Sequence, residues 1–281
     1  MITLAENRYG KSRVRMVRVK RDHGQHHLHE WTVQVLLQGD FETCFRDGDN
    51  SKILPTDTMK NTVYSLARKS NAASIEEFAS ELIDFILGRN SQVTEAEISV
   101  SDTPWDHLVA SAEAHPTTFV QASNERQTTR VCGKQNGSHS VESGLENLLI
   151  MKTAKSGFEG YIRDSLTTLP PTSDRLLGTA LKGTWIYSSE HRDFQRSRKA
   201  IRETLLSTFA EHDSKSVQHT LYAMGESVLK NVQEIDSIEL TMPNIHCLPV
   251  DLSRFGQDNP NEIFVPIDEP HGYIEARLRR G

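Results

Sequence analysis

The sequence predicts an α+β fold in which two units of similar design follow one another along the chain. Three observations support this prediction. Strand patterns occur in both halves of the chain, and two helical patterns lie between the strands of each half. A polar, glycine-containing stretch, Gly133–Gly144, separates the halves. We therefore place the units at residues 1–136 and 137–281, each an antiparallel sheet with two helices on one face.

Strand patterns open and close each half. The clearest covers residues 30–38, where Trp31 and Val33 alternate with polar side chains. The polar segment before it, residues 22–29, is the expected hairpin loop. The other expected strands lie at residues 12–20, 93–101, 117–132, 145–152, 183–188, 236–242, 246–252 and 273–279.

Four helices are expected, two in each half. The clearest follows Ser74, which can form a capping box with Glu77, and it carries an apolar stripe from Ile75 to Ile86. A helix starting near Asp57 precedes it. The second half has helical patterns near residues 194–210 and 215–232.

Composition excludes several classes of protein. The net charge of −6, without any block of five like charges, argues against a nucleic-acid partner. No apolar run reaches the length of a membrane span, and the first residues lack the apolar core of a signal peptide. The three cysteines, Cys44, Cys132 and Cys247, are far apart, which argues against a disulfide scaffold or zinc ribbon. We therefore expect a cytoplasmic protein.

A histidine cluster stands out in the first hairpin: His23, His26, His27 and His29. Four imidazoles in seven residues can hold zinc or nickel. The alternative is an exposed polar turn. No carboxylate or cysteine joins the cluster at a helical spacing, so we expect no metal site and no catalytic role here.

Seven short segments gain meaning when taken together. They are Arg8–Lys11, Pro55–Asp57 with Lys60–Thr62, Gly157–Asp164, Thr167–Leu169, Asp174–Arg175, Ser216–Gln218 and Pro243–His246. Each is weak by itself. In this order and at this spacing, over nearly the whole chain, they resemble the urate oxidase (uricase) family.

The resemblance implies the tunnelling fold, in which each chain has two tandem units with four-stranded antiparallel sheets and two helices on one face. It further implies a barrel-like homotetramer with active sites at subunit interfaces. The implied reaction is oxidation of urate by O2 and water to 5-hydroxyisourate and H2O2, in purine catabolism and with no cofactor. The chain ends in RLRRG rather than the peroxisomal Ser-Lys-Leu signal, which favours a bacterial origin.

Urate is a planar anion, and the implied substrate-binding residues suit it. Arg175 offers a planar fork of donors to an anionic edge, and Gln218 offers a donor and an acceptor to the opposite edge. Phe158 can stack on the ring. The resemblance adds the backbone N–H of Val217 at a helix start, and Asn244 above the ring where O2 and water bind.

The resemblance also implies the proton machinery. Lys11 is the base that deprotonates urate further, Thr56 relays the proton, and His246 orients the lysine or exchanges its proton. Thr56 and Asp57 also bind substrate at a helix start. Without the resemblance, Thr56 and Asp57 fit an ordinary helix N-cap and His246 fits an ordinary strand residue.

Two other functions stay open on the sequence. A different tunnelling-fold enzyme acting on purines or pterins would need a Cys/His zinc set, which the matched segments lack. Such enzymes commonly anchor substrate through a glutamate, where this chain has Gln218. An inactive purine-binding homologue would not need both Lys11 and Thr56.

Overall fold

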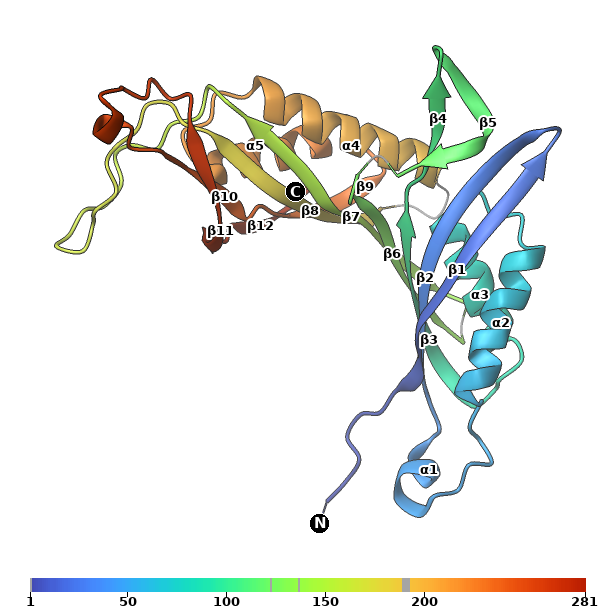
Figure 1. The fold of residues 1–281 in the computed structure, drawn as a ribbon. Coiled ribbons are helices and arrows are strands. Elements are labelled where there is room, and N and C mark those ends of the chain that lie inside the picture. The colour runs from blue at the N-terminus through green and yellow to red at the C-terminus, as the bar shows by residue number, and fades with distance from the viewer. Residues whose placement is uncertain (1, 122, 136, 189–192) are drawn as a thin grey trace. The chain divides into compact units, whose positions relative to one another are not determined.

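The computed structural model describes residues 2–121, 123–135, 137–188 and 193–281 (Figure 1). It divides the chain into two compact units, Met1–Gly144 and Leu145–Gly281. The division falls at the C-terminal end of the predicted joint, Gly133–Gly144. The boundary expected at Asn136, and the part of the expected strand 117–132 at Ala122, lie outside the described residues.

The first unit is an antiparallel sheet with helices packed on one face (Figure 1). Neighbouring strands are joined in the order β1, β2, β3, β6 and the first part of β7. Strands β4 and β5 form a separate two-stranded ribbon. The elements are β1 (Tyr9–Asp22), β2 (Gln25–Gly39), α1 (Glu42–Asp47), α2 (Thr56–Lys69), α3 (Ile75–Leu87), β3 (Val93–Thr103), β4 (Asp106–Ala110), β5 (Glu113–Val120), β6 (Arg126–Lys134) and β7 (His139–Lys152).

The core of the first unit joins β2 to α3. Side chains alternate along β2, so that Trp31, Val33, Val35 and Leu37 are all buried. The ring of Phe78 in α3 lies 4.9 Å from that of Trp31 and is fully buried. The apolar stripe of the helix therefore covers the apolar face of the strand, as the sequence pattern predicts.

Helix α3 starts with a variant of the predicted capping box, in which Glu77 bonds the residue before the N-cap rather than Ser74 itself. The Ser74 hydroxyl accepts a hydrogen bond from the Glu77 N–H at 3.2 Å, and the Glu77 carboxylate accepts one from the Ala73 N–H at 2.7 Å. These two bonds satisfy donors that an uncapped helix start would leave free.

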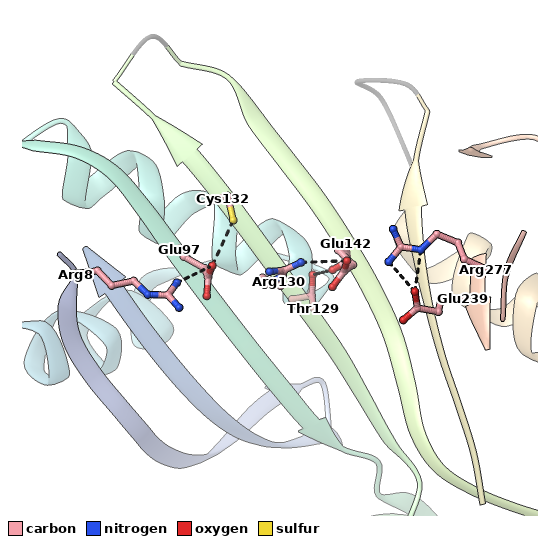
Figure 2. A network of polar contacts seen from close by, with 8 residues as sticks. All are labelled: Arg8, Glu97, Thr129, Arg130, Cys132, Glu142, Glu239 and Arg277. Carbon is pink, nitrogen blue, oxygen red and sulfur yellow. Dashed lines mark hydrogen bonds and ion pairs between the residues drawn. The ribbon is translucent and has the colours of Figure 1, made fainter. Parts of the chain in front are cut away.

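The opposite face of the first sheet is polar (Figure 2). Glu97 of β3 lies 3.6 Å from Arg8 and accepts a hydrogen bond from the Cys132 thiol, while Arg130 pairs with Glu142 at 3.2 Å. Cross-strand pairs of opposite charge add modest stability. The second unit has such a pair in Glu239 and Arg277.

The second unit is also an antiparallel sheet covered by helices (Figure 1). Strand β8 follows β7 in the sheet, and β9 and β10 both pair with β8 on its other side. Strands β12 and β11 pair with β9 and β10 in turn. The elements are β8 (Leu177–Tyr187), α4 (Phe194–Glu211), α5 (Val217–Asn231), β9 (Ile235–Thr241), β10 (Asn244–Pro249), the short 3-10 turn η1 (Ser253–Phe255), β11 (Phe264–Gly272) and β12 (Glu275–Arg279).

Strands β9 and β10 follow one continuous line beside β8, broken at Met242 and Pro243. Thr241 lies opposite Lys182, and Asn244 lies opposite Thr179, so the register is the same on both sides of the break. Proline has no N–H to donate to a sheet ladder. The interruption thus places Asn244 at the start of a new strand segment.

The structure corrects the expected histidine loop. Strands β1 and β2 run to Asp22 and Gln25, so the turn consists of His23 and Gly24 alone, both with positive φ. Such a two-residue turn matches the twist of the hairpin strands. His26 and the two histidines after it lie in β2, because polar side chains can occupy an exposed strand end.

Other segments also differ from the expectations. The expected strand 117–132 is replaced by β5 and β6, which pair with different partners. Helix α1 and strands β4 and β11 were not predicted, because these segments are short or lack a clear apolar period. In the described part of the chain, no helix is long and apolar enough to cross a membrane.

We predict that Phe78→Ala destabilises the protein by about 3–5 kcal/mol, because it removes a fully buried ring and leaves a cavity beside Trp31. Phe45→Ala is the control, since Phe45 is 52% exposed and its loss should change stability by less than about 0.5 kcal/mol. Urea unfolding followed by tryptophan fluorescence measures both. Equal losses in the two variants would contradict this description of the core.

Candidate active site

The start of helix α2 carries two of the predicted site residues and differs from the starts of α3, α4 and α5. Its N-cap is Pro55, which offers no capping side chain, whereas Ser74 and Ser216 cap α3 and α5. The expectation that Thr56 and Asp57 themselves form the N-cap is wrong, since Thr56 is already the first helical residue. The first-turn N–H groups therefore have no side-chain cap and can serve a ligand.

Asp57 is an exposed carboxylate held by its own helix. It accepts hydrogen bonds from Lys60 and from Asn61. The hydrogen bond from Lys60 is the main cause that lowers the pKa of Asp57, and the charge of Lys11 adds to the effect. Lys11 is thus close enough to the start of α2 for its positive charge to interact with the Asp57 carboxylate.

The motif that contains Lys11 is tied to the start of α2 through Tyr9. The Tyr9 hydroxyl accepts a hydrogen bond from the Leu54 N–H at 2.8 Å and donates one to the Leu54 carbonyl at 3.2 Å. Gly10 packs so tightly on β2 that an added Cβ would lie 1.8 Å from the Val35 carbonyl oxygen. The segment before Lys11 is therefore fixed on both sides, and a register shift between Lys11 and Val14 follows it.

In the second unit, backbone hydrogen bonds join three segments that carry predicted site residues. The N–H of Gly157 donates to the Ser214 carbonyl at 2.8 Å, just before α5. Phe158 exchanges two hydrogen bonds with Thr172, and the Arg175 N–H donates to the Ser156 carbonyl at 2.7 Å. These hydrogen bonds thus hold Phe158, Arg175 and the start of α5 close to one another.

Arg175 combines burial with free hydrogen-bonding capacity. Its guanidinium carbon lies 5.1 Å from the centre of the Phe158 ring. Its Nε is buried and has no hydrogen-bond partner among the described residues. Burial lowers the pKa of Arg175. A buried cationic donor without a partner is costly, and a planar anion would satisfy it.

Tyr161 supports the Phe158 ring, and the sequence analysis gave it no role. The two rings stack with centres 4.8 Å apart and an angle of 11°. The Tyr161 hydroxyl donates to the Leu169 carbonyl at 2.5 Å, and Arg163 lies over the Tyr161 ring. The presence of two aromatic residues, Phe158 and Tyr161, within Gly157–Asp164 was the sequence feature that could have indicated this role.

Helix α5 presents Val217 and Gln218 in its first turn. Ser216 caps the helix by accepting a hydrogen bond from the His219 N–H at 3.1 Å. Val217 is buried, so its side chain anchors the start of the helix. Gln218 is exposed. The helix start therefore offers an N–H group and an amide side by side.

A cavity of about 360 Å³ in the second unit brings together three predicted residues, Arg175, Asn244 and His246. Asn244 is buried, and its Nδ2 lies 3.4 Å from the Nδ1 of His246. Phe158, Val217 and Gln218 do not line this cavity, although Phe158 contacts Arg175. Lys11, Thr56 and Asp57 belong to the first unit.

The described residues contain no cluster of three or more His, Cys, Asp or Glu side chains arranged to hold a metal ion. The histidines of the first hairpin therefore form no such cluster within the described chain.

Comparison with known proteins decides the family. The family model described as Uricase matches residues 7–132 and 141–275. The chain belongs to the uricase family. The uricase of Dictyostelium discoideum is 36% identical over 100% of this chain and 98% of its own length. The uricase of Oryctolagus cuniculus is 34% identical over 97% of this chain and 93% of its own.

Solved uricase structures have the same fold. The crystal structure of uricase from Arthrobacter globiformis has a TM-score of 0.94 and 36% identity, covering 100% of this chain and 96% of that one. The urate oxidase of Bacillus sp. TB-90 has a TM-score of 0.84 at 22% identity, covering 98% of this chain and 100% of that one, which shows likeness of fold. The α+β uricase architecture is thus confirmed.

Proposed function

We propose that this chain is a urate oxidase that oxidises urate with O2 and water to 5-hydroxyisourate and H2O2, using no metal or organic cofactor. Membership of the uricase family over almost the whole chain supports the proposal. The structural observation that carries it is the half-buried Arg175, whose Nε has no partner among the described residues and which lies beside the Phe158 ring.

Substrate binding follows from the chemistry of a flat anion. Arg175 donates in the ring plane to the anionic edge, and Gln218 pairs with the opposite edge. Phe158, backed by Tyr161, stacks on the ring. The N–H of Val217 adds a donor at the positive end of α5.

Three further residues complete the proposed substrate site. Thr56 and Asp57 contribute donors from the uncapped start of α2. Asn244 holds O2, and later water, above the ring; its burial in the cavity beside His246 suits this role.

Proton transfer uses Lys11, Thr56 and His246. Lys11 removes a proton from urate, the Thr56 hydroxyl relays it because a hydroxyl both donates and accepts, and His246 orients the lysine or exchanges its proton. Deprotonated urate is electron-rich. It gives one electron to O2, and the urate radical and superoxide combine at C5 to form a hydroperoxide. Loss of H2O2 and addition of water at C5 then give 5-hydroxyisourate.

We further propose a homotetramer of tandem tunnelling-fold units, with each active site shared by two subunits. Strand β1 has β2 as its only strand partner in the described chain, and such an open edge favours pairing with another strand. The polar face of the first sheet suits the inside of a hydrated barrel. We place the enzyme in the cytoplasm, where its three free cysteines would stay reduced.

Cofactor independence is the first test of this function. Protein treated with a chelator and gel-filtered should consume urate and O2 and release H2O2, because the chain's own residues activate the substrate. Urate absorbance, an oxygen electrode and a peroxide assay measure this. Turnover of a pterin or another purine in place of urate, or a requirement for added metal or flavin, would contradict the proposal. Binding without turnover would indicate an inactive homologue.

The roles of Lys11 and Arg175 predict opposite kinetic defects. Lys11→Met should lower kcat by at least about a hundredfold, because it removes the general base, and should leave binding of a non-reacting urate analogue within about threefold. Arg175→Ala should weaken analogue binding by about 2–5 kcal/mol, because it removes a buried charged donor. Steady-state kinetics with urate measure kcat, and calorimetry with the analogue measures binding by both variants. The reverse pattern would exchange the assigned roles.

A shared site predicts recovery of activity in mixed oligomers. Thr56→Ala and Arg175→Ala should each be nearly inactive when pure. Unfolded, mixed and refolded together, they should regain about one quarter of the wild-type activity, since about half of randomly formed pairs are mixed and half of their sites are intact. Refolded wild type and each refolded single variant are the controls. Well-folded mixed oligomers without any recovery would show that each site lies within one chain.

A further inference from the structure

Helix α5 begins with the same variant of the capping box as α3, with a histidine in place of the glutamate. Ser216 accepts a hydrogen bond from the His219 N–H at 3.1 Å, and the Nδ1 of His219 lies 3.3 Å from the Lys215 N–H. In α3 the corresponding acceptor is the Glu77 carboxylate. The two helix starts thus share their geometry, but only the start of α5 depends on an imidazole.

The hydrogen bonds fix the protonation of both rings in this pair. A backbone N–H can only donate, so the Nδ1 of His219 must accept and carries no proton. The Nε2 of His212 lies 3.2 Å from the same Nδ1, so His212 must be the donor of that bond. His212 is the C-cap of α4. The pair therefore ties the end of α4 to the start of α5.

The charged groups around the pair favour this arrangement. Lys152 of β7 donates to the His212 carbonyl, and Asp213 and Lys215 of the linker pair with each other at 2.7 Å. Burial, and then the charges of His219, Lys152 and Lys215, lower the pKa of His212, with Asp213 opposing them.

Protonation of His219 would have two unfavourable effects. A proton on Nδ1 removes the acceptor for the Lys215 N–H and for His212, so the cap keeps only the hydrogen bond to Ser216. The new positive charge also lies at the N-terminal end of a helix, where the helix dipole disfavours a cation. Val217 and Gln218 are the two residues between Ser216 and His219, so a loosened cap loosens both.

We propose that His219, held by His212, is a positioning residue for the substrate contacts of Val217 and Gln218, and that its protonation weakens urate binding. This inference rests on the urate oxidase function proposed above. The sign follows from the acceptor role: as pH falls and Nδ1 gains a proton, KM for urate rises. The effect on kcat is small, because neither histidine touches the reacting atoms.

Two substitutions at one position test the inference. His219→Ala removes the acceptor and should raise KM by about three- to tenfold at about pH 8, the effect of a lost helix cap, with kcat within about twofold. His219→Gln keeps an acceptor that does not titrate. It should keep a KM near the wild-type value at about pH 8, and should lose the part of the KM increase that the wild type shows as the pH falls.

Glu77→Ala is the matched control, because it removes the same kind of acceptor from α3, which carries none of the proposed site residues. It should lower the thermal midpoint and leave KM unchanged. Steady-state kinetics on the intact protein, with circular dichroism to verify folding, provide the readouts. If His219→Ala does not fold, the comparison of wild type with His219→Gln decides alone.

The inference is overturned if folded His219→Ala has the wild-type KM, or if His219→Gln shows the full wild-type rise of KM in acid. Titration of urate itself changes KM equally in every variant, so only the difference between variants counts. A wild-type protein that does not oxidise urate would contradict the proposed function, which is a separate outcome.

Discussion

Each sheet has one apolar face that must be removed from water, and the rest of the structure depends on this constraint. Along β2 the buried side chains from Trp31 to Leu37 require a cover, and α3 supplies it through Phe78. In the second unit α5 covers β9 and β12 in the same way. Once a helix is packed on its sheet, the position of its first turn is fixed. The backbone N–H groups and side chains of that turn are thereby fixed as well.

The two helix starts that carry the proposed site residues are capped differently. The start of α2 has Pro55 as its N-cap and no capping side chain, so its N–H groups are available to a ligand. The start of α5 is capped by Ser216, with His219 completing the cap from inside the helix. Its backbone is thus held in place while the Gln218 side chain stays exposed.

The second unit contains an arginine, Arg175, whose buried Nε has no hydrogen-bond partner among the described residues. A buried donor without a partner costs about 1–3 kcal/mol, which a ligand can recover. The backbone hydrogen bond from the Arg175 N–H to the Ser156 carbonyl, and the two between Phe158 and Thr172, hold the arginine and the ring in register despite this cost. Tyr161 stacks on Phe158 and donates a hydrogen bond to the Leu169 carbonyl, so it restricts the movement of the Phe158 ring. The arrangement suits the flat anion proposed as substrate.

The sequence by itself determined the class of each half, the capping box at Ser74 and Glu77, and the family, because local periodicity and short ordered motifs carry that information. It did not show that Pro55 rather than Thr56 is the N-cap, since both residues favour a helix start. It did not indicate the role of Tyr161, whose value depends on a ring brought beside it. Only the tertiary structure decided that Arg175, Asn244 and His246 share a cavity and that His212 reaches His219. The physical reason is that packing of helices on sheets, rather than local preference, sets the geometry of these contacts. Arg175 is distant in sequence from Asn244 and His246, whereas His212 and His219 meet because the end of α4 is packed against the start of α5.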